Sequence, residues 1–297
     1  MKRVLRIALG ALAVMVLALV GQHLRLGATE PPPPRDDALL RVASFNVHYI
    51  VLGQTEGRWS EAGWQDRRGA VDAAFKRLDA DIIAFQEMES FQRGSDGSVN
   101  LARDFLLAQN PGYAAAASGD WRSFPSTQPV FYRKDRVTPL DQGWFFFSDT
   151  PDVIYSQTYN GSYPAFASWV RFDTPQGPVT VVNLHVDAFS RDNRRRSLAL
   201  VAERIAPMRS QGAVIVAGDF NALAGSPLLR RLKALGLAFP RAKASFHFDK
   251  GLHLFGAIDH IGFVGLTAAG GPYVVQGRFD GVFPADHYPV VTDFRRP

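Results

Sequence analysis

Polar side chains that can bind a cation or transfer a proton stand in short clusters spread along the chain. Gly218-Asp219-Phe220-Asn221 holds a carboxylate and an amide two residues apart, and Asp219 and Asn221 share one face if the segment is extended. Oxygen ligands of this kind suit a hard divalent cation and a phosphate oxygen. An ordinary Asx turn is the alternative interpretation of the same pattern.

A second cluster places an acid directly beside an imidazole. Asp286 and His287 are adjacent ahead of an expected strand, and neighbouring residues cannot easily share one strand face. We therefore expect Asp286 to face a metal and His287 to face a reacting water or phosphate. Asp259, another acid at the edge of an apolar run, can orient His287 and fix its tautomer. The alternative interpretation makes His287 a satisfied core or surface histidine, and the neighbouring His260 is interpreted as structural.

Two further polar residues follow apolar runs. Glu87 comes after residues 82–85, where an unpaired buried carboxylate is costly and a cation would remove that cost. A Glu exposed at a strand end is the alternative. His185 follows residues 179–184 and stands two residues before Asp187, a pattern that phosphate chemistry can use. The basic triplet at residues 194–196 is more simply a solvated helix face.

The elements that must position these side chains alternate between strand and helix patterns. Residues 42–47 read as a strand that carries Asn46, with Ala43, Phe45 and Val47 on the opposite face. Helical spacing covers residues 64–79 and a second stretch that ends near Pro207. Further strands are expected at residues 82–85, 130–132, 167–172, 179–184, 214–217, 261–264 and 290–294. Each polar residue of interest lies in or at the end of one of these strands, which predicts an α/β fold that holds them rigidly.

Composition excludes several kinds of chemistry. The chain has 297 residues, 46% of them hydrophobic, and is expected to be globular. It has no cysteine, so thiol catalysis, thiolate metal sites and disulfides are excluded, and any metal must use oxygen and nitrogen ligands. The formal charge of +5 is partly due to the first 40 residues, so the remainder is only weakly basic and does not demand nucleic acid.

The N-terminal segment has the pattern of an export signal. Lys2, Arg3 and Arg6 precede an apolar run at residues 7–20, and four prolines at residues 31–34 form an extended spacer. We expect a signal anchor or signal peptide at residues 1–24, a Pro-rich linker at residues 25–40 and a catalytic domain at residues 41–297. The positive charges before the run direct the domain out of the cytoplasm. An uncleaved helix would anchor it to the inner membrane facing the periplasm, and cleavage would release it.

Six motifs occur in chain order and together resemble those of the endonuclease/exonuclease/phosphatase superfamily. They are Ser44-Phe45-Asn46-Val47-His48, Phe85-Gln86-Glu87, Asn183-Leu184-His185, Gly218-Asp219-Phe220-Asn221-Ala222, Ile258-Asp259-His260-Ile261 and Asp286-His287-Tyr288-Pro289. Weaker matches at residues 132–135 and 147–151 are similar to its bacterial branch. Two positions depart from the family pattern, since Ala285 stands where Ser is common and Ala165 where Arg is frequent.

The resemblance implies a four-layer α/β/β/α sandwich of two mixed, largely antiparallel sheets and a Mg2+ or Mn2+ site. By position it makes Glu87 the principal metal ligand, with Asn46 and Asp286 near it. It assigns Asp219 and Asn221 to the attacking water, the leaving group and a phosphate oxygen. It gives His185, and His287 backed by Asp259, acid/base or phosphate-stabilising roles.

The expected reaction is attack of water on a phosphodiester or phosphomonoester. The substrate class stays open between nucleic acid, a small phosphoester and a lipid, and a nuclease or general phosphodiesterase is the preferred interpretation. Lipid-cleaving relatives often have an exposed apolar hairpin, for which residues 144–147 are a candidate, although a core strand is the simpler interpretation. A catalytically silent binding module and a lipid-surface protein with an incidental site are the alternatives from other classes. The chain is expected to be a monomer.

Overall fold

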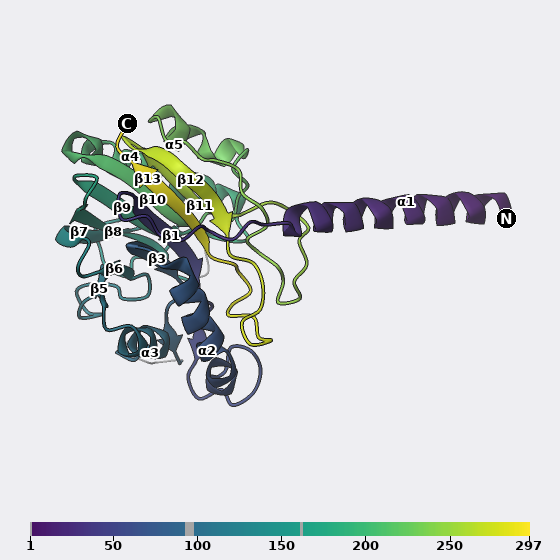
Figure 1. Cartoon of the computed structure of the whole chain (residues 1–297), viewed down its shortest axis with the longest axis horizontal. Helices are drawn as coiled ribbons and strands as arrows, with labels where there is room; N and C mark the ends of the chain where they lie inside the picture. Colours follow the sequence, from purple (N-terminus) through teal and green to yellow (C-terminus); the bar gives the residue numbers. More distant parts are fainter. Residues whose placement is uncertain (1, 93–97, 161–162) are drawn as a thin grey trace.

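A computed structural model describes residues 2–92, 98–160 and 163–297 of the chain. Figure 1 shows one folded domain from which a single helix, α1 (Lys2–Gly27), projects along the long axis of the molecule. The part from Arg6 to Gly27 is, among the described residues, the one helix long and apolar enough to cross a membrane, and none of its most apolar window is buried in the domain. This exposure excludes a core helix, because a core helix buries its apolar face.

A six-stranded sheet forms one half of the domain, in the order β12-β13-β1-β3-β6-β5. Its strands are β1 (Leu40–Asn46), β3 (Ile82–Gln86), β5 (Tyr113–Ala116), β6 (Val130–Arg133), β12 (Thr267–Val274) and β13 (Val290–Arg295). Strands β1 and β3 run parallel, and every other neighbouring pair is antiparallel. The parallel pair brings Asn46 and Gln86 side by side at the same end of the sheet.

A five-stranded sheet forms the other half, in the order β11-β10-β9-β8-β7. Its strands are β7 (Thr138–Phe146), β8 (Phe166–Asp173), β9 (Val179–His185), β10 (Ala213–Asp219) and β11 (Asp259–Val264). Only β9 and β10 are parallel. Both sheets are therefore mixed and largely antiparallel, as predicted. A short parallel pair, β2 (Ile50–Val51) and β4 (Ser90–Phe91), lies outside them.

Three apolar clusters define the layers. The cluster between the sheets joins residues such as Val42 and Ile82 of the first sheet to Val181 and Ile215 of the second. A second cluster packs α2 (Glu61–Leu78) and α3 (Leu101–Gln109) on the outer face of the six-stranded sheet. A third packs α4 (Arg191–Ile205) and α5 (Arg230–Ala234) on the other sheet. The predicted α/β/β/α sandwich is confirmed.

The alternation of side chains on β1 and β3 explains these layers. Ala43, Phe45 and Val47 share one face, as the sequence predicted, and this face packs on the helices, while Val42 faces the second sheet. The uninterrupted apolar run of β3 is buried on both faces, since Ile82 lies between the sheets and residue 83 lies under α2. A strand buried on both faces needs no polar alternation.

A buried polar contact crosses from one sheet to the other next to the strand ends. Gln86 Nε2 on β3 donates to Asn183 Oδ1 on β9 at 2.7 Å, and Asn183 Nδ2 donates to the carbonyl of Phe85 at 2.7 Å. Buried amides are stable only when such bonds are made, so this pair fixes how the two sheets meet. The edge of the sandwich that carries the polar motifs is thus held rigidly.

Some boundaries differ from the sequence expectations. Helix α1 continues to Gly27, because its last carbonyls find partners in the domain. The apolar stretch at residues 144–147 agrees with the simpler expectation, because Phe145 and Phe146 at the end of β7 and Phe147 after it are buried and form no exposed hairpin. The short 3-10 helices η1 (Pro207–Gln211) and η2 (Pro227–Leu229) link the outer helices to the sheet.

Candidate active site

Strand pairing aligns three of the predicted residues in one row. Asp219, the last residue of β10, pairs with His185 at the end of β9 and with Asp259 at the start of β11. In the other sheet, Asn46 ends β1 and Glu87 immediately follows β3. Because the sheets pack face to face, the two sets meet at one end of the sandwich. Asn46 Nδ2 makes the contact between them, lying 2.9 Å from Glu87 Oε1 and 3.4 Å from Asp219 Oδ2.

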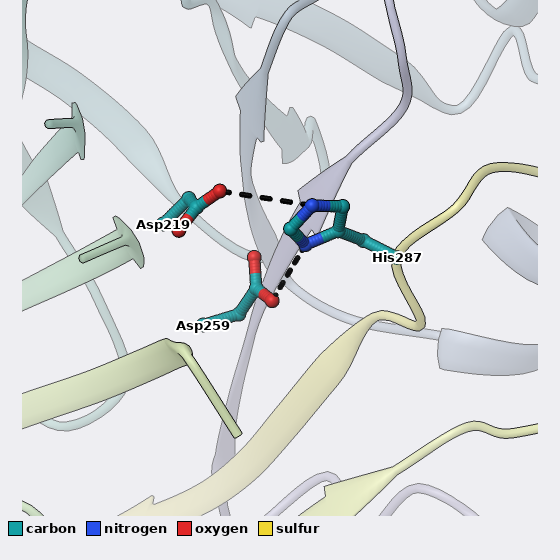
Figure 2. Close-up of side chains that lie close together, drawn as sticks. All are labelled: Asp219, Asp259 and His287. Atoms are coloured by element: carbon teal, nitrogen blue, oxygen red, sulfur yellow. Dashed lines mark hydrogen bonds and ion pairs between the residues drawn. The ribbon is translucent and has the colours of Figure 1, made fainter. Parts of the chain in front are cut away.

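A buried carboxylate holds the His287 ring in place (Figure 2). His287 Nδ1 lies 2.8 Å from Asp259 Oδ2, and His287 Nε2 lies 3.8 Å from Asp219 Oδ2 on the other side of the ring. The same Asp259 oxygen accepts a hydrogen bond from Ser245 Oγ at 2.6 Å. Burial alone would lower the pKa of His287, but the carboxylates of Asp259, Asp219 and Asp286 raise it well above its ordinary value. The Nδ1 bond to Asp259 fixes the ring so that Nε2 faces Asp219.

Asp219 stands at the centre of the arrangement. Its Oδ2 lies 3.5 Å from His185 Nε2, and its Oδ1 accepts the backbone N–H of Asn221 at 2.8 Å. Burial and the nearby Asp259 carboxylate raise its pKa to about 6. A carboxylate with a pKa near neutrality is well matched to accept a proton from water.

Asn221 lies beside this group in a different conformation from the one expected. Its φ of 44° is left-handed, so Asp219 and Asn221 do not share an extended face. The Asx turn, the alternative that the sequence left open, forms here. Asn221 Nδ2 donates to the carbonyl of Val186 at 2.9 Å, which ties the turn to the end of β9.

Glu87 supplies oxygen atoms beside Asn46, and Asp286 supplies others next to His287. The backbone N–H of Tyr49 lies 3.4 Å from Glu87 Oε2, and His185 Nδ1 lies 3.9 Å from Glu87 Oε1. Asp286 Oδ1 is buried and has no hydrogen-bond partner within the described ranges of the chain. Burial would raise the pKa of Asp286, yet His287, His48 and Arg58 outweigh it and lower that pKa. An ionised buried oxygen without a donor fits a cation ligand, because leaving it unpaired is costly.

Three of the nine non-glycine residues with positive φ in the described part of the chain lie around the same place. His48, Glu87 and Asn221 have φ values of 63°, 53° and 44°, in the left-handed region that residues with a Cβ rarely adopt. Each follows the end of a strand that carries a site residue. Strained residues of this kind cluster at functional sites, where surrounding structure holds them.

Two buried residues that sequence reasoning did not select hold the site together. Arg67 on α2 donates to the carbonyls of Val47, His48 and Pro284, and so joins the loop after β1 to the loop that carries Asp286. Burial lowers its pKa to about 10. Ser245 supports Asp259, as described above. A buried position on an amphipathic helix was the available signal for Arg67, whereas nothing local distinguishes Ser245.

Other motif residues have structural partners. His260 Nε2 lies 2.7 Å from the carbonyl of Ala222, in agreement with its structural interpretation. Asp187 caps the turn before α4 by accepting the backbone N–H groups of Phe189 and Ser190. In the basic triplet, Arg195 pairs with Asp192 and Arg196 with Asp149, so these charges are already paired on the helix surface.

A family model for the endonuclease/exonuclease/phosphatase family matches residues 43–287. The chain belongs to this family. Its members are phosphoesterases that depend on divalent metals. The matched segment contains every candidate site residue, from Asn46 to His287, and ends before β13. The predicted family is confirmed. No curated protein matches the chain.

Solved structures show the same fold. An endonuclease/exonuclease/phosphatase from Bacteroides vulgatus has a TM-score of 0.70 and 22% identity, covering 87% of this chain and 99% of its own. A mannosyl-6-phosphatase from Bacteroides thetaiotaomicron has a TM-score of 0.67 and 22% identity, covering 86% and 99%. D. rerio TDP2, solved with a single-strand DNA product, has a TM-score of 0.61 and 15% identity, covering 87% and 99%. At these identities the likeness concerns the fold.

Proposed function

We propose that this family member is a magnesium-dependent phosphoesterase, carried out of the cytoplasm by α1, that hydrolyses a phosphodiester or phosphomonoester by in-line attack of water. One observation carries the proposal. Residues from both sheets converge in a buried group of carboxylates, amides and imidazoles that contains an ionised oxygen without a donor, on Asp286. Manganese is the alternative cation.

The donor set suits a hard cation. Glu87 and Asp286 would hold it through carboxylate oxygens, the ligands that magnesium prefers. Asn46 would add its Oδ1, which here also accepts the backbone N–H of His48 at 3.1 Å. When bound, the cation would neutralise negative charge on the phosphate and the leaving oxygen. The close group formed by Asp219, Asp259 and His287 also has ligand atoms within 4.8 Å of one another. We assign that group to proton transfer, because both His287 nitrogens already face carboxylates.

Three side chains would act on water and phosphate. Asp219 Oδ2 would accept a proton from the attacking water, since its raised pKa makes it a stronger base than an exposed carboxylate. His287, held by Asp259, would direct its Nε2–H to a phosphate oxygen. His185 lies 3.5 Å from Asp219 and would stabilise the same phosphate group.

The substrate is assigned only as a phosphoester. The similar structures include a mannosyl-6-phosphatase and a protein with a single-strand DNA product, so both monoesters and diesters deserve testing. A panel with Mg2+ and Mn2+ against plasmid DNA, RNA, sugar phosphates, phospholipids and bis-p-nitrophenyl phosphate would identify the class. Metal binding without hydrolysis of any of these would instead support a non-catalytic binding module.

Substitution of Glu87 tests the metal assignment. Glu87→Gln should require a higher concentration of Mg2+ for half-maximal activity, because the cation loses a charged ligand. Glu56→Gln is the control, since Glu56 is an exposed acid outside the site. Full activity in excess EDTA, or the same metal dependence in Glu87→Gln and the wild type, would contradict the proposal.

A further inference from the structure

The C-terminal end of α1 is part of the folded domain. The carbonyl of Leu26 accepts hydrogen bonds from the backbone N–H of Ala244 at 3.4 Å and from Gln276 Nε2 at 3.1 Å. Lys243 Nζ donates to the carbonyl of Arg25 at 2.8 Å. These bonds satisfy the last carbonyls of the helix, which otherwise have no partner. The C-terminal end of α1 is therefore fixed against the domain, and this attachment point is called the seat of α1 below.

Side chains one turn earlier make the same attachment. The ring of His23 stacks on that of His253 with 4.9 Å between centroids, and His23 Nδ1 accepts the backbone N–H of His253. Gln22 Nε2 donates to the carbonyl of Leu254. Leu26 is buried, whereas residues 7–20 are exposed and stand clear of the domain (Figure 1). Only the last two turns of the helix thus belong to the domain.

The length of the helix places this seat at a membrane surface. The apolar segment Arg6–Gly27 has 22 residues, and the hydrocarbon core of a bilayer is crossed by ~20 helical residues. If Arg6 reaches the headgroups on one side, the helix leaves the hydrocarbon core on the other side close to Leu26. The docked turns then lie among the lipid headgroups.

A basic cavity opens at that level. It has a volume of about 740 Å³ and is bordered by the cations of Arg25, Arg241 and Lys243. No acidic residue is among the described residues that line it. Arg241 is exposed and makes neither a hydrogen bond nor an ion pair with any residue that the structure describes. Leu223 and Phe255 also line the cavity, so it combines positive charge with apolar surface.

The same segment reaches the candidate site. Ser245, which follows the Ala244 that bonds to α1, donates to Asp259, and the ring of Phe246 lies 4.9 Å from that of His287. Leu252 and Leu254, on the loop that receives α1, are exposed apolar residues. The distance from the seat of α1 to the Asp259 and His287 pair is therefore fixed by a few residues of ordered chain.

We propose that the cavity lined by Arg25, Arg241 and Lys243 binds the phosphate headgroup of an anionic phospholipid, and that this contact seats the candidate site at the lipid–water interface. The proposal rests on the proposed function and adds to it that α1 is kept as a membrane anchor. Guanidinium and ammonium groups bind lipid phosphate through charge-assisted hydrogen bonds. Each basic group near an anionic bilayer adds to the attraction.

Lipid titration with the full chain tests the headgroup site. The detergent-purified protein would be titrated with short-chain phosphatidylglycerol or phosphatidylcholine, and binding followed by amide hydrogen exchange of residues 241–256. We expect saturable protection with phosphatidylglycerol only. Arg241→Ala with Lys243→Ala should weaken binding roughly 10- to 30-fold. Arg241→Ala alone should weaken it several-fold, and this variant leaves the bond from Lys243 to α1 in place.

A matched pair of charges supplies the control. Lys76→Ala with Arg77→Ala also removes one lysine and one arginine, from the exposed end of α2 that precedes β3, at the opposite end of the sheet from Glu87. This control should bind phosphatidylglycerol like the wild type. Equal weakening in both double variants, or equal protection by both lipids, would overturn the headgroup site.

The state of the exported chain is a separate outcome. N-terminal sequencing of the protein from its host membrane should find α1 intact, and a mature chain that begins after Leu26 would overturn the proposal. Hydrolysis of soluble bis-p-nitrophenyl phosphate by the purified chain tests the phosphoesterase assignment alone. Loss of lipid binding with hydrolysis retained would overturn the headgroup site alone. Lipid binding without hydrolysis would overturn the phosphoesterase assignment alone.

Discussion

Buried carboxylates have different partners at the two ends of the sandwich. At the end away from the candidate site, Asp81 is fully buried and accepts from Arg35 at 3.2 Å and Arg136 at 3.1 Å. Beside it, Arg41 makes two hydrogen bonds to Asp293, which link β1 to β13. At the site end, carboxylates face imidazoles and other carboxylates, and one buried oxygen of Asp286 has no partner in the described part of the structure.

This difference separates stability from function within one fold. Arginine is always charged, so the far end satisfies its acids permanently and joins neighbouring strands. At the site end the charge is left to be balanced by a proton, a cation or a substrate, and the pKa of Asp219 rises as a result of burial and of Asp259. Functional sites commonly accept such a cost while the rest of the fold offsets it.

The largest effect is expected at the site end, on turnover. Asp219→Asn removes the proposed proton acceptor, and kcat should fall ~100- to 10,000-fold. Circular dichroism should show an unchanged fold, because the amide has the same shape as the carboxyl group. Near-wild-type turnover on a good substrate would show that Asp219 is not the base.

At the far end, substitution should act on stability and spare turnover. Asp81→Ala removes a fully buried carboxylate that accepts from Arg35, Arg136 and the backbone N–H of Arg41, which should lower the free energy of unfolding by roughly 2 kcal/mol. Urea denaturation measures this change. The value of kcat at a temperature where the variant is folded should match the wild type. If Asp81→Ala were as stable as the wild type but had low activity, the division of stability and function between the two ends would be wrong.

Removing metal should reveal a pH dependence at the site end. Asp219 has an ordinary pKa of 3.8 and a pKa of about 6 in the folded chain, so the fold holds its proton more tightly. Its contribution to stability is therefore present below pH 3.8 and lost as the pH rises through about 6. In EDTA, Asp219→Asn should gain up to about 3 kcal/mol over the wild type across this range. Unfolding curves at several pH values would test this, and a constant difference would contradict it.

A smaller effect is expected from the support of Asp259. Ser245→Ala removes the hydroxyl donor to Asp259 Oδ2, and kcat should fall about tenfold with little change in KM. The pH profile of kcat should also shift, since Asp259 acts on the charge of His287. Ser210→Ala removes a comparable hydroxyl bond in an exposed turn and should leave both unchanged. A lower stability without a shifted pH profile would make Ser245 purely structural.

Local patterns in the sequence predicted the main strands and helices and most of the polar residues of the site, whereas the four layers were implied by the family resemblance. Alternation placed Ala43, Phe45 and Val47 on one face of β1, and the unbroken apolar run of β3 indicated burial on both faces. The motifs then named Glu87 and Asp219 because each lies directly at the end of such a strand. These properties depend on residues within a few positions of each other, which is the range over which side-chain periodicity works.

Only the tertiary structure decided how these strand ends meet and what supports them. The row of His185, Asp219 and Asp259 arises from strand register, and the contact from Asn46 to Asp219 arises from the packing of one sheet on the other. Arg67 acts on loops that are distant in sequence, so no local pattern could assign its role. The docking of α1 likewise depends on residues more than 200 positions away, and a hydropathy pattern carries no information about such partners.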